Sequence, residues 1–179
     1  MSTLKAPVTP RDHISGPATA PVTLVEYGDY ECSHCGAAHP IVKHVREHFG
    51  PRLRFVFRHF PLNQAHPNAE SAAESAEFAG THSRFWEMHD GIYENQDRLG
   101  LPLLFALAAA LGLSELDLRA ALMNGTYASK VRSDFLGGVR SGVNGTPSFF
   151  IDGVRHDGPY AFDDLVAAVE LRLYAKTSL

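Results

Sequence analysis

The stretch Val22-Thr23-Leu24-Val25-Glu26-Tyr27-Gly28-Asp29-Tyr30-Glu31-Cys32-Ser33-His34-Cys35 carries both cysteines of the chain directly after an apolar run. The first seven residues are nearly all apolar or β-favouring, which predicts a strand buried on both faces. The last four residues place two residues between two thiols, the spacing at which two sulfurs at the start of a helix can form a small disulfide ring. The sequence therefore predicts thiol–disulfide chemistry.

The residues after the cysteines predict an amphipathic helix. Its apolar side chains recur at helical spacing: Ala38, Ile41, Val42, Val45 and Phe49. At a helix N-terminus the unpaired N–H groups and the positive end of the dipole favour an anion, so we expect the pKa of the Cys32 thiol to be lowered. Cys32 is then the attacking thiol and Cys35 the resolving thiol. His34 offers a second donor or a positive charge beside the Cys32 sulfur.

Glu26 is a carboxylate inside the apolar run, six residues before Cys32. Burial there would raise its pKa and let it exchange a proton with Cys35. The alternative is an exposed acid on an edge strand. Pro40 lies inside the predicted helix, where it lacks an N–H group and should kink the helix one turn beyond the cysteines.

A second motif lies far along the chain, at Val143-Asn144-Gly145-Thr146-Pro147-Ser148-Phe149-Phe150-Ile151-Asp152-Gly153. It reads as a loop, a Thr-Pro bond, a strand and an Asp-Gly turn. The proline suggests a cis peptide bond, although trans is the commoner state of X–Pro bonds.

Residues 27–35, 55–62 and 143–150 together resemble the DsbA-like branch of the thioredoxin superfamily. The resemblance implies an α/β protein with a thioredoxin-like fold and an inserted helical subdomain. It implies a single domain over residues 1–179, with a thioredoxin core at about 8–62 and 143–179 and a helical insertion at about 63–142.

The resemblance also assigns roles to individual residues. It implies that Cys32 is the nucleophile and Cys35 the resolving thiol. It further implies that Pro147 is a cis-proline facing the cysteines and that Thr146 offers its backbone to an extended substrate. The dipeptide Ser33-His34 stands where thioredoxins carry Gly-Pro and the best-known periplasmic oxidases carry Pro-His, so the family does not fix the redox poise.

The activity expected from these features is that of an enzyme, a thiol–disulfide oxidoreductase acting on protein or small-molecule thiols. It needs no metal and no cofactor beyond the redox-active Cys32–Cys35 disulfide, and an external redox partner must reset the pair. One alternative is a zinc-binding module formed by the cysteines with His34 or His39. Another is a glutathione-dependent isomerase or transferase on a related scaffold, which would not need Cys35.

Composition narrows the partners and the location. The chain has 179 residues, 45% hydrophobic and 20% charged, as expected of a single globular domain. Its net charge of −4, with interspersed signs, provides no basic patch for nucleic acid or a membrane surface. The N-terminus lacks the apolar core of a signal peptide, which indicates the cytoplasm if Met1 is the natural start and otherwise leaves a periplasmic or extracytoplasmic location open.

The remaining pattern predicts the other elements. We expect further strands at about 53–60, 148–151 and 154–156, an edge strand near Val8, and a closing helix that includes Phe162. The apolar run 101–111 is shorter than the roughly 20 residues that cross a bilayer and predicts a core helix. Ser114, with Asp117 three residues later, predicts a helix start. Arg58 and His59 are expected to face outward, and His39 to be a solvated helix residue.

Overall fold

The computed structural model describes residues 2–177. It divides into two compact units. The sheet unit comprises Met1–Gly28, Ala37–Arg58 and Leu136–Leu179, and the helical unit comprises Asp29–Gly36 and His59–Phe135. Both cysteines belong to the helical unit, although the strand before them belongs to the sheet unit.

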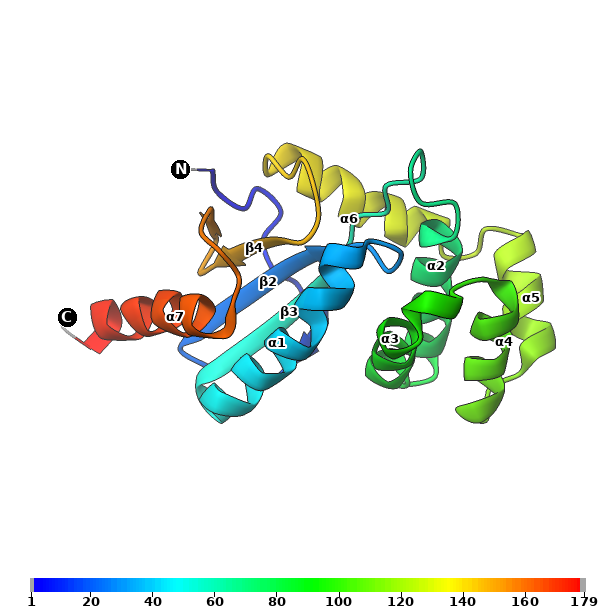
Figure 1. The fold of residues 1–179 in the computed structure, drawn as a ribbon, viewed down its shortest axis with the longest axis horizontal. Helices are drawn as coiled ribbons and strands as arrows, with labels where there is room; N and C mark the ends of the chain where they lie inside the picture. The colour runs from blue at the N-terminus through cyan, green and yellow to red at the C-terminus, as the bar shows by residue number, and fades with distance from the viewer. Residues whose placement is uncertain (1, 178–179) are drawn as a thin grey trace. The chain divides into compact units, whose positions relative to one another are not determined.

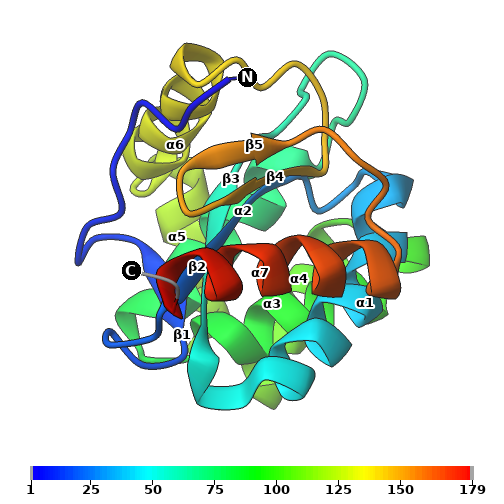
Figure 2. The same ribbon diagram turned by 90° about the vertical axis from the view of Figure 1, so that its left-hand side faces the viewer.

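Five strands form one sheet in the order β1-β3-β2-β4-β5. They are β1 (His13–Ser15), β2 (Val22–Gly28), β3 (Leu53–His59), β4 (Ser148–Ile151) and β5 (Val154–His156) (Figure 1 and Figure 2). β4 pairs antiparallel with both β2 and β5, and β1 pairs antiparallel with β3. β2 lies at the centre of the sheet, and six of its seven residues are buried. This position explains its nearly continuous apolar run.

The edge strand is at His13–Ser15 and not near Val8, where the sequence predicted it. His13 pairs with Phe57 of β3. Pro7 directly precedes Val8, and Pro10 follows it by two residues. Prolines have no N–H group to donate to a strand ladder, so a strand is disfavoured there.

Two helices belong wholly or mainly to the sheet unit, α1 (Ser33–Phe49) and α7 (Phe162–Thr177). α1 connects β2 to its neighbour β3, and Pro40 lies inside it. α7 contacts β2 and β4 (Figure 2). Its Leu165 and Val169 are buried. The prediction that His39 is solvated is wrong, because its side chain is 7% exposed. His39 follows the buried Cys35 by four residues and therefore shares the buried face of α1.

The helical unit contains α2 (Ala69–Thr81), α3 (Phe85–Glu94), α4 (Leu101–Ala110), α5 (Glu115–Met123) and most of α6 (Ala128–Arg140). α2 contacts α3, α4 and α5, and nine of its residues are buried. α4 buries only Leu104 and Ala108, so the run predicted as a core helix has one buried face. Ser114 caps α5 as predicted, because its hydroxyl accepts a hydrogen bond from the N–H of Asp117 at 3.1 Å.

Arg58 and His59 are buried, which contradicts the prediction that they face outward. β3 lies between β1 and β2, and both side chains find partners inside the protein. Arg58 donates hydrogen bonds to both carboxylate oxygens of Asp12, at 2.7 and 3.0 Å, and to the hydroxyl of Tyr27 at 2.9 Å. Nε2 of His59 lies 2.8 Å from a carboxylate oxygen of Glu77. Pairing makes such burial of polar groups possible.

Within residues 2–177, no helix combines the length and apolar character needed to cross a membrane.

Candidate active site

The two cysteines lie at the N-terminal end of α1. Cys32 directly precedes the first helical residue, and its carbonyl oxygen accepts a hydrogen bond from the N–H of Gly36 at 3.0 Å. Cys32 is 6% exposed and Cys35 is fully buried, whereas Ser33 and His34 are exposed. Cys32 is therefore the cysteine nearer to solvent, and its role as the attacking thiol stays a prediction.

Asp29 connects the cysteines to the surrounding loops. Its backbone N–H donates a hydrogen bond to Sγ of Cys35 at 3.4 Å, and its carbonyl oxygen accepts one from the N–H of Cys32 at 3.2 Å. Its buried carboxylate accepts hydrogen bonds from the N–H groups of Glu31 and Leu62, both at 2.8 Å. Asp29 thus fixes the backbone before α1 and contacts both cysteines.

The same carboxylate holds a histidine. Nδ1 of His66 lies 2.7 Å from an oxygen of Asp29, and the His66 side chain is 23% exposed. The hydrogen bond to Asp29 raises the pKa of His66 above its ordinary value of 6.5, and partial burial opposes this shift. Negative charge on Cys32 and Glu31 raises the pKa of His66 further. His66 therefore carries positive charge to higher pH than an ordinary histidine.

Gln96 holds the other side of the loop. Its side-chain amide donates hydrogen bonds to the carbonyl oxygens of Tyr30 at 2.8 Å and Cys32 at 2.9 Å. A Cβ atom on Gly36 would lie 2.2 Å from the amide oxygen of Gln96. A side chain at residue 36 would therefore require the Gln96 side chain to move.

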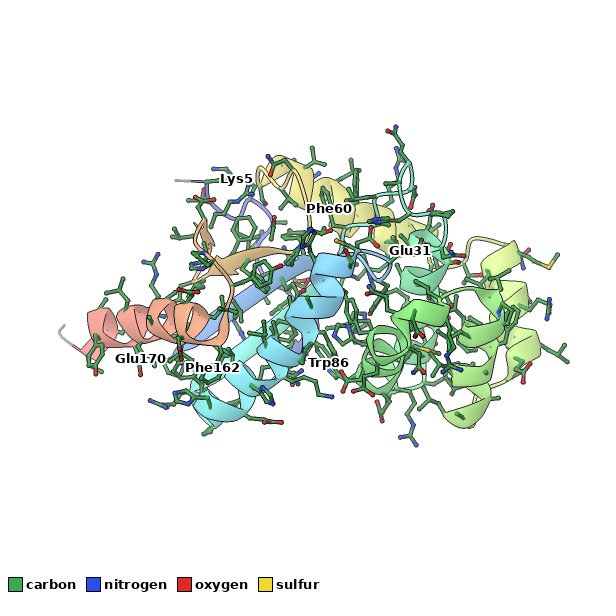
Figure 3. The ribbon with its side chains drawn as sticks, in the orientation of Figure 1. Lys5, Glu31, Phe60, Trp86, Phe162 and Glu170 are labelled. Carbon is green, nitrogen blue, oxygen red and sulfur yellow. The ribbon has the colours of Figure 1, made fainter. Side chains whose placement is uncertain are left out.

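Two further contacts anchor the segment between Asp29 and Cys32 to helices of the helical unit. The carboxylate of Glu31 accepts hydrogen bonds from the backbone and side-chain N–H groups of Asn68, at 2.6 and 2.9 Å, beside the start of α2 (Figure 3). The hydroxyl of Tyr30 lies 2.9 Å from Nδ1 of His89 on α3. Each residue of this segment thus has its own partner.

The other predicted site residues belong to the sheet unit. Glu26 is 3% exposed, and burial raises its pKa from 4.5 to about 8, opposed by the positive charge of Arg46. The Thr146–Pro147 bond is cis, as the sequence predicted, and the next residue, Ser148, pairs with Tyr27 of β2. Proton exchange by Glu26 and substrate binding by Thr146 and Pro147 stay predictions.

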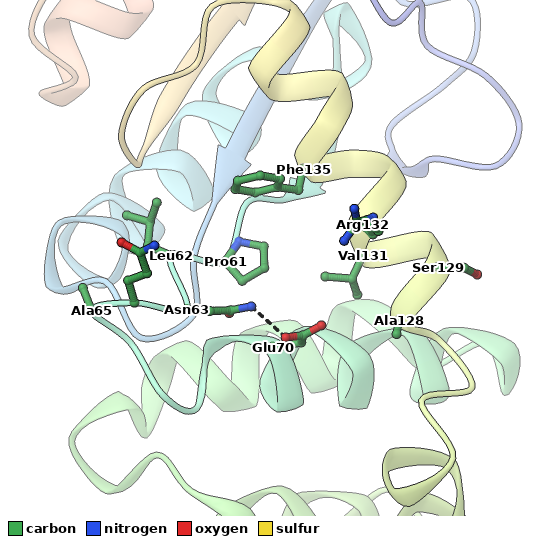
Figure 4. Close-up of a pocket in the computed structure, with 11 residues that line it drawn as sticks. Pro61, Leu62, Asn63, Ala65, Glu70, Ala128, Ser129, Val131, Arg132 and Phe135 are labelled. Carbon is green, nitrogen blue, oxygen red and sulfur yellow. Dashed lines mark hydrogen bonds between the residues drawn. The ribbon is translucent and has the colours of Figure 1, made fainter.

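A pocket of about 710 Å³ lies in the helical unit between the loop after β3 and α6 (Figure 4). Its apolar lining includes Pro61, Leu62, Val131 and Phe135. Its polar lining includes Arg132, which is exposed, and Asn63, which donates a hydrogen bond to Glu70 at 2.7 Å. The N–H of Leu62 is the group bound by Asp29, so one wall of the pocket is tied to the cysteine loop.

Sequence reasoning missed Asp29, His66 and Gln96 as parts of the site. A local signal existed for Asp29, because an Asp side chain that accepts the N–H two residues later is a common turn ahead of a helix. His66 and Gln96 reach the cysteine loop from segments more than 30 residues away. Only the tertiary structure brings them there.

The sequence matches the family model described as Thioredoxin over residues 8–171. The chain belongs to the thioredoxin family. The fold of this chain is also similar to the folds of two solved structures. BdbD from Bacillus subtilis is 22% identical, with 97% of this chain and 98% of that chain covered and a TM-score of 0.87. The alpha-DsbA1 protein of Wolbachia pipientis is 22% identical, with 97% and 95% covered and a TM-score of 0.83. The predicted DsbA-like thioredoxin fold with inserted helices is confirmed.

Curated relatives of this thioredoxin-family chain carry a different kind of name. A Na(+)/H(+) antiporter NhaA 1 from Salinispora arenicola is 45% identical over 167 residues, which is 93% of this chain and 26% of that protein. A protein of the same name from Mycobacterium sp. (strain KMS) is 41% identical over 171 residues, 94% of this chain and 28% of that protein. The chain spans about a quarter of the length of these relatives.

Proposed function

We propose that the chain is a thiol–disulfide oxidoreductase that exchanges disulfides with protein or small-molecule thiols through Cys32 and Cys35. The observation that carries the proposal is the asymmetric placement of the two cysteines at the start of α1, with Cys32 nearer to solvent and Cys35 fully buried. Such exchange requires an attacking sulfur that a substrate can reach and a resolving sulfur that is more deeply shielded.

In the oxidising direction, a substrate thiolate attacks Sγ of Cys32, the Cys32–Cys35 bond breaks, and Cys35 leaves as a thiolate that takes up a proton. A second substrate thiolate then attacks the substrate sulfur of the mixed disulfide, and Cys32 leaves as a thiolate. The substrate loses two electrons and the protein gains them, so an external redox partner must reoxidise the pair. In the reducing direction, Cys32 attacks a substrate disulfide and Cys35 resolves the adduct.

Other residues support these steps in the proposal. Glu26 has a pKa of about 8, so its protonated form can donate a proton to the Cys35 thiolate in the oxidising direction and its ionised form can accept the Cys35 proton in the reducing direction. His34 offers a donor beside Cys32. Thr146 offers its backbone to an extended substrate, next to Pro147. No metal or organic cofactor takes part in this scheme.

The pocket beside the loop after β3 is the proposed site for a substrate side chain. Its apolar walls, among them Leu62 and Phe135, suit an apolar residue near the substrate cysteine. Arg132 at the pocket suits an acidic residue of the same substrate. Support for a link to the chemistry comes from Leu62, whose N–H binds Asp29.

The names of the curated relatives add one partner class to this proposal. The antiporter name belongs to proteins of which this chain matches about a quarter of the length. We therefore propose thiol chemistry for the matched part and a Na(+)/H(+) antiporter as one class of partner.

The cellular compartment sets the direction of the disulfide exchange. Reduction or repair of oxidised proteins fits the cytoplasm, and disulfide formation fits an extracytoplasmic location.

Trapping of a mixed disulfide tests the proposal. Reduced Cys35→Ser protein, incubated with insulin as a disulfide-containing protein, is expected to form an adduct at Cys32 that dithiothreitol releases and that peptide mass spectrometry locates. The Cys32→Ser variant is expected to form none. Equal amounts of adduct in the Cys35→Ser and Cys32→Ser proteins would overturn the proposal. One tightly bound zinc ion per chain that protects both thiols of the wild-type protein would also overturn it. Full catalytic turnover by Cys35→Ser would favour a glutathione-dependent enzyme.

A further inference from the structure

We propose that His66, held by Asp29, is a positioning residue that supplies a positive charge to Cys32 and stabilises its thiolate. The inference rests on the proposed function. It assigns a role in the thiol–disulfide exchange to a histidine outside the Cys32–Cys35 motif. Asp29 and His66 are called the Asp29–His66 pair below.

The geometry of the pair links it directly to the cysteines. Oδ2 of Asp29 lies 2.7 Å from Nδ1 of His66, while the backbone of Asp29 bonds the N–H of Cys32 and Sγ of Cys35 at 3.2 and 3.4 Å. The backbone N–H of His66 donates a hydrogen bond to the carbonyl oxygen of Leu62 at 2.9 Å, which fixes the loop that carries the imidazole. Asp29 therefore binds the cysteine segment through its backbone and His66 through its carboxylate.

Asp29 contacts His66 directly at 2.7 Å, and the negative charges of Asp29, Cys32 and Glu31 each raise the pKa of His66. Glu31 is bound by two N–H groups of Asn68, and Asp29 by the N–H groups of Glu31 and Leu62. Both carboxylates are thus held in place by hydrogen-bond donors. His66 is the cationic member of this cluster.

Coupling between two titrating groups is reciprocal. If the Cys32 thiolate favours the imidazolium of His66, then the imidazolium favours the thiolate by the same free energy. A stabilised thiolate at Cys32 makes Cys32 a better leaving group when a substrate thiolate attacks the substrate sulfur of the mixed disulfide. It also destabilises the Cys32–Cys35 disulfide relative to the reduced pair, so the protein becomes a stronger oxidant.

The most direct test follows the His66 ring protons by NMR in wild-type protein across pH, in the reduced and in the disulfide form. The expected result is a higher pKa of His66 in the reduced form, because only that form carries a thiolate at Cys32. In reduced Cys32→Ser protein the pKa of His66 is expected to fall to the value of the disulfide form. Equal pKa values of His66 in the two redox forms of the wild type would overturn the inference.

A second test measures the equilibrium with glutathione for His66→Gln, which keeps a side-chain donor for Asp29 but removes the charge. Loss of a nearby positive charge is expected to favour the disulfide about tenfold, which is about 30 mV for a two-electron couple. The matched control is His44→Gln, on an exposed position of α1. A change of less than about twofold in a folded His66→Gln protein would contradict the inference.

The two proposals fail in different ways. If wild-type protein forms no Cys32–Cys35 disulfide in any glutathione buffer, the proposed function is wrong. If the disulfide forms with the same equilibrium constant in wild-type and His66→Gln protein, the redox function stands and only the role of the Asp29–His66 pair is wrong.

Discussion

The side-chain amide nitrogen of Gln96 lies 2.9 Å from the carbonyl oxygen of Cys32, and the same nitrogen also binds the carbonyl oxygen of Tyr30 at 2.8 Å. A residue of the helical insertion therefore holds the backbone of Cys32. The contact also restricts Gly36, because a Cβ atom there would lie 2.2 Å from the amide oxygen of Gln96.

We predict that Gly36→Ala lowers the free energy of unfolding. The new methyl group displaces Gln96, whose two hydrogen bonds each contribute about 1 kcal/mol. Alanine gains about 1 kcal/mol of helix propensity over glycine, so the net loss is expected to be about 1 kcal/mol. Urea denaturation measures it, and mixed-disulfide formation at Cys32 is expected to slow at the same time.

Gln96→Ala provides the matched background for Gly36→Ala. Without the Gln96 side chain the added methyl group has space, so Gly36→Ala is expected to stabilise the protein in that background by about 1 kcal/mol. The sign of the effect therefore reverses between the two backgrounds. The same sign in both would show that Gln96 does not restrict residue 36.

Glu26 makes stability depend on pH. Its pKa is raised from 4.5 to about 8 in the folded protein, so the folded state binds the proton more tightly than the unfolded state does. The stability that this contributes is fully present below about pH 4.5 and is lost as pH rises through about 8. We predict that the free energy of unfolding falls by about 4 kcal/mol over this range.

Glu26→Gln is expected to flatten this profile, and the variant is expected to be more stable than wild type at pH 8. The raised pKa of His66 acts in the same direction, so a smaller slope should persist. Glu47→Gln, at an exposed position of α1, is the control and should keep the wild-type profile. An unchanged slope in Glu26→Gln would show that Glu26 is ionised in the folded protein.

The pocket beside α6 is expected to act on polypeptide substrates only. Phe135→Ala removes much of an apolar wall, so we predict a KM about tenfold higher for a disulfide-bonded peptide with an apolar residue next to its cysteine. The equilibrium with glutathione should not change. Equal loss for the peptide and for glutathione would assign the effect to the fold and not to the pocket.

Charge reversal at the pocket gives an independent test. Arg132→Glu is expected to raise KM for a peptide with an acidic residue beside the apolar one, and to lower it for the peptide with lysine at that position. Arg140→Glu makes the same change at an exposed position of α6 outside the pocket lining and should leave both KM values unchanged. Matching shifts in the two variants would indicate a general charge effect.

Arg58 is expected to hold the N-terminal segment on the sheet unit. It donates to both carboxylate oxygens of Asp12 and to the carbonyl oxygens of Ala6 and Pro7. Lysine cannot reproduce this geometry, so Arg58→Lys is predicted to cost about 3 kcal/mol and to make residues 2–12 sensitive to proteolysis. The exposed Arg11→Lys is the control. Wild-type proteolysis of Arg58→Lys would disprove this role.

The sequence predicted those helices and strands whose bounds depend on neighbouring residues, through apolar spacing, turn residues and helix caps. The apolar stripe after the cysteines predicted α1, and the Asp-Gly turn between two short runs predicted β4 and β5. Ser114 marked the start of α5 through its side-chain cap. The prediction of an edge strand near Val8 was wrong, because the two prolines that flank Val8 have no N–H group for strand pairing.

The site could be predicted only where its residues are neighbours in sequence. Cys32, Cys35 and the buried acid Glu26 follow from spacing and pattern. The Asp29–His66 pair and the Gln96 contact depend on loops that meet only in the folded chain. Arg58 looked like an outward-facing strand residue because its partner, Asp12, lies 46 residues earlier and on no predicted element.

The central claim is that Cys32 and Cys35 form a reversible two-electron redox couple. The most direct measurement equilibrates the wild-type chain with glutathione buffers of graded ratio, alkylates the remaining thiols in acid-quenched samples, and counts the labels by mass spectrometry. The account predicts one cooperative transition between chains with two labels and chains with none, with the unlabelled form carrying the Cys32–Cys35 disulfide. Chains that keep two labels under every oxidising ratio, or that pass only to one glutathione adduct per chain, would contradict it.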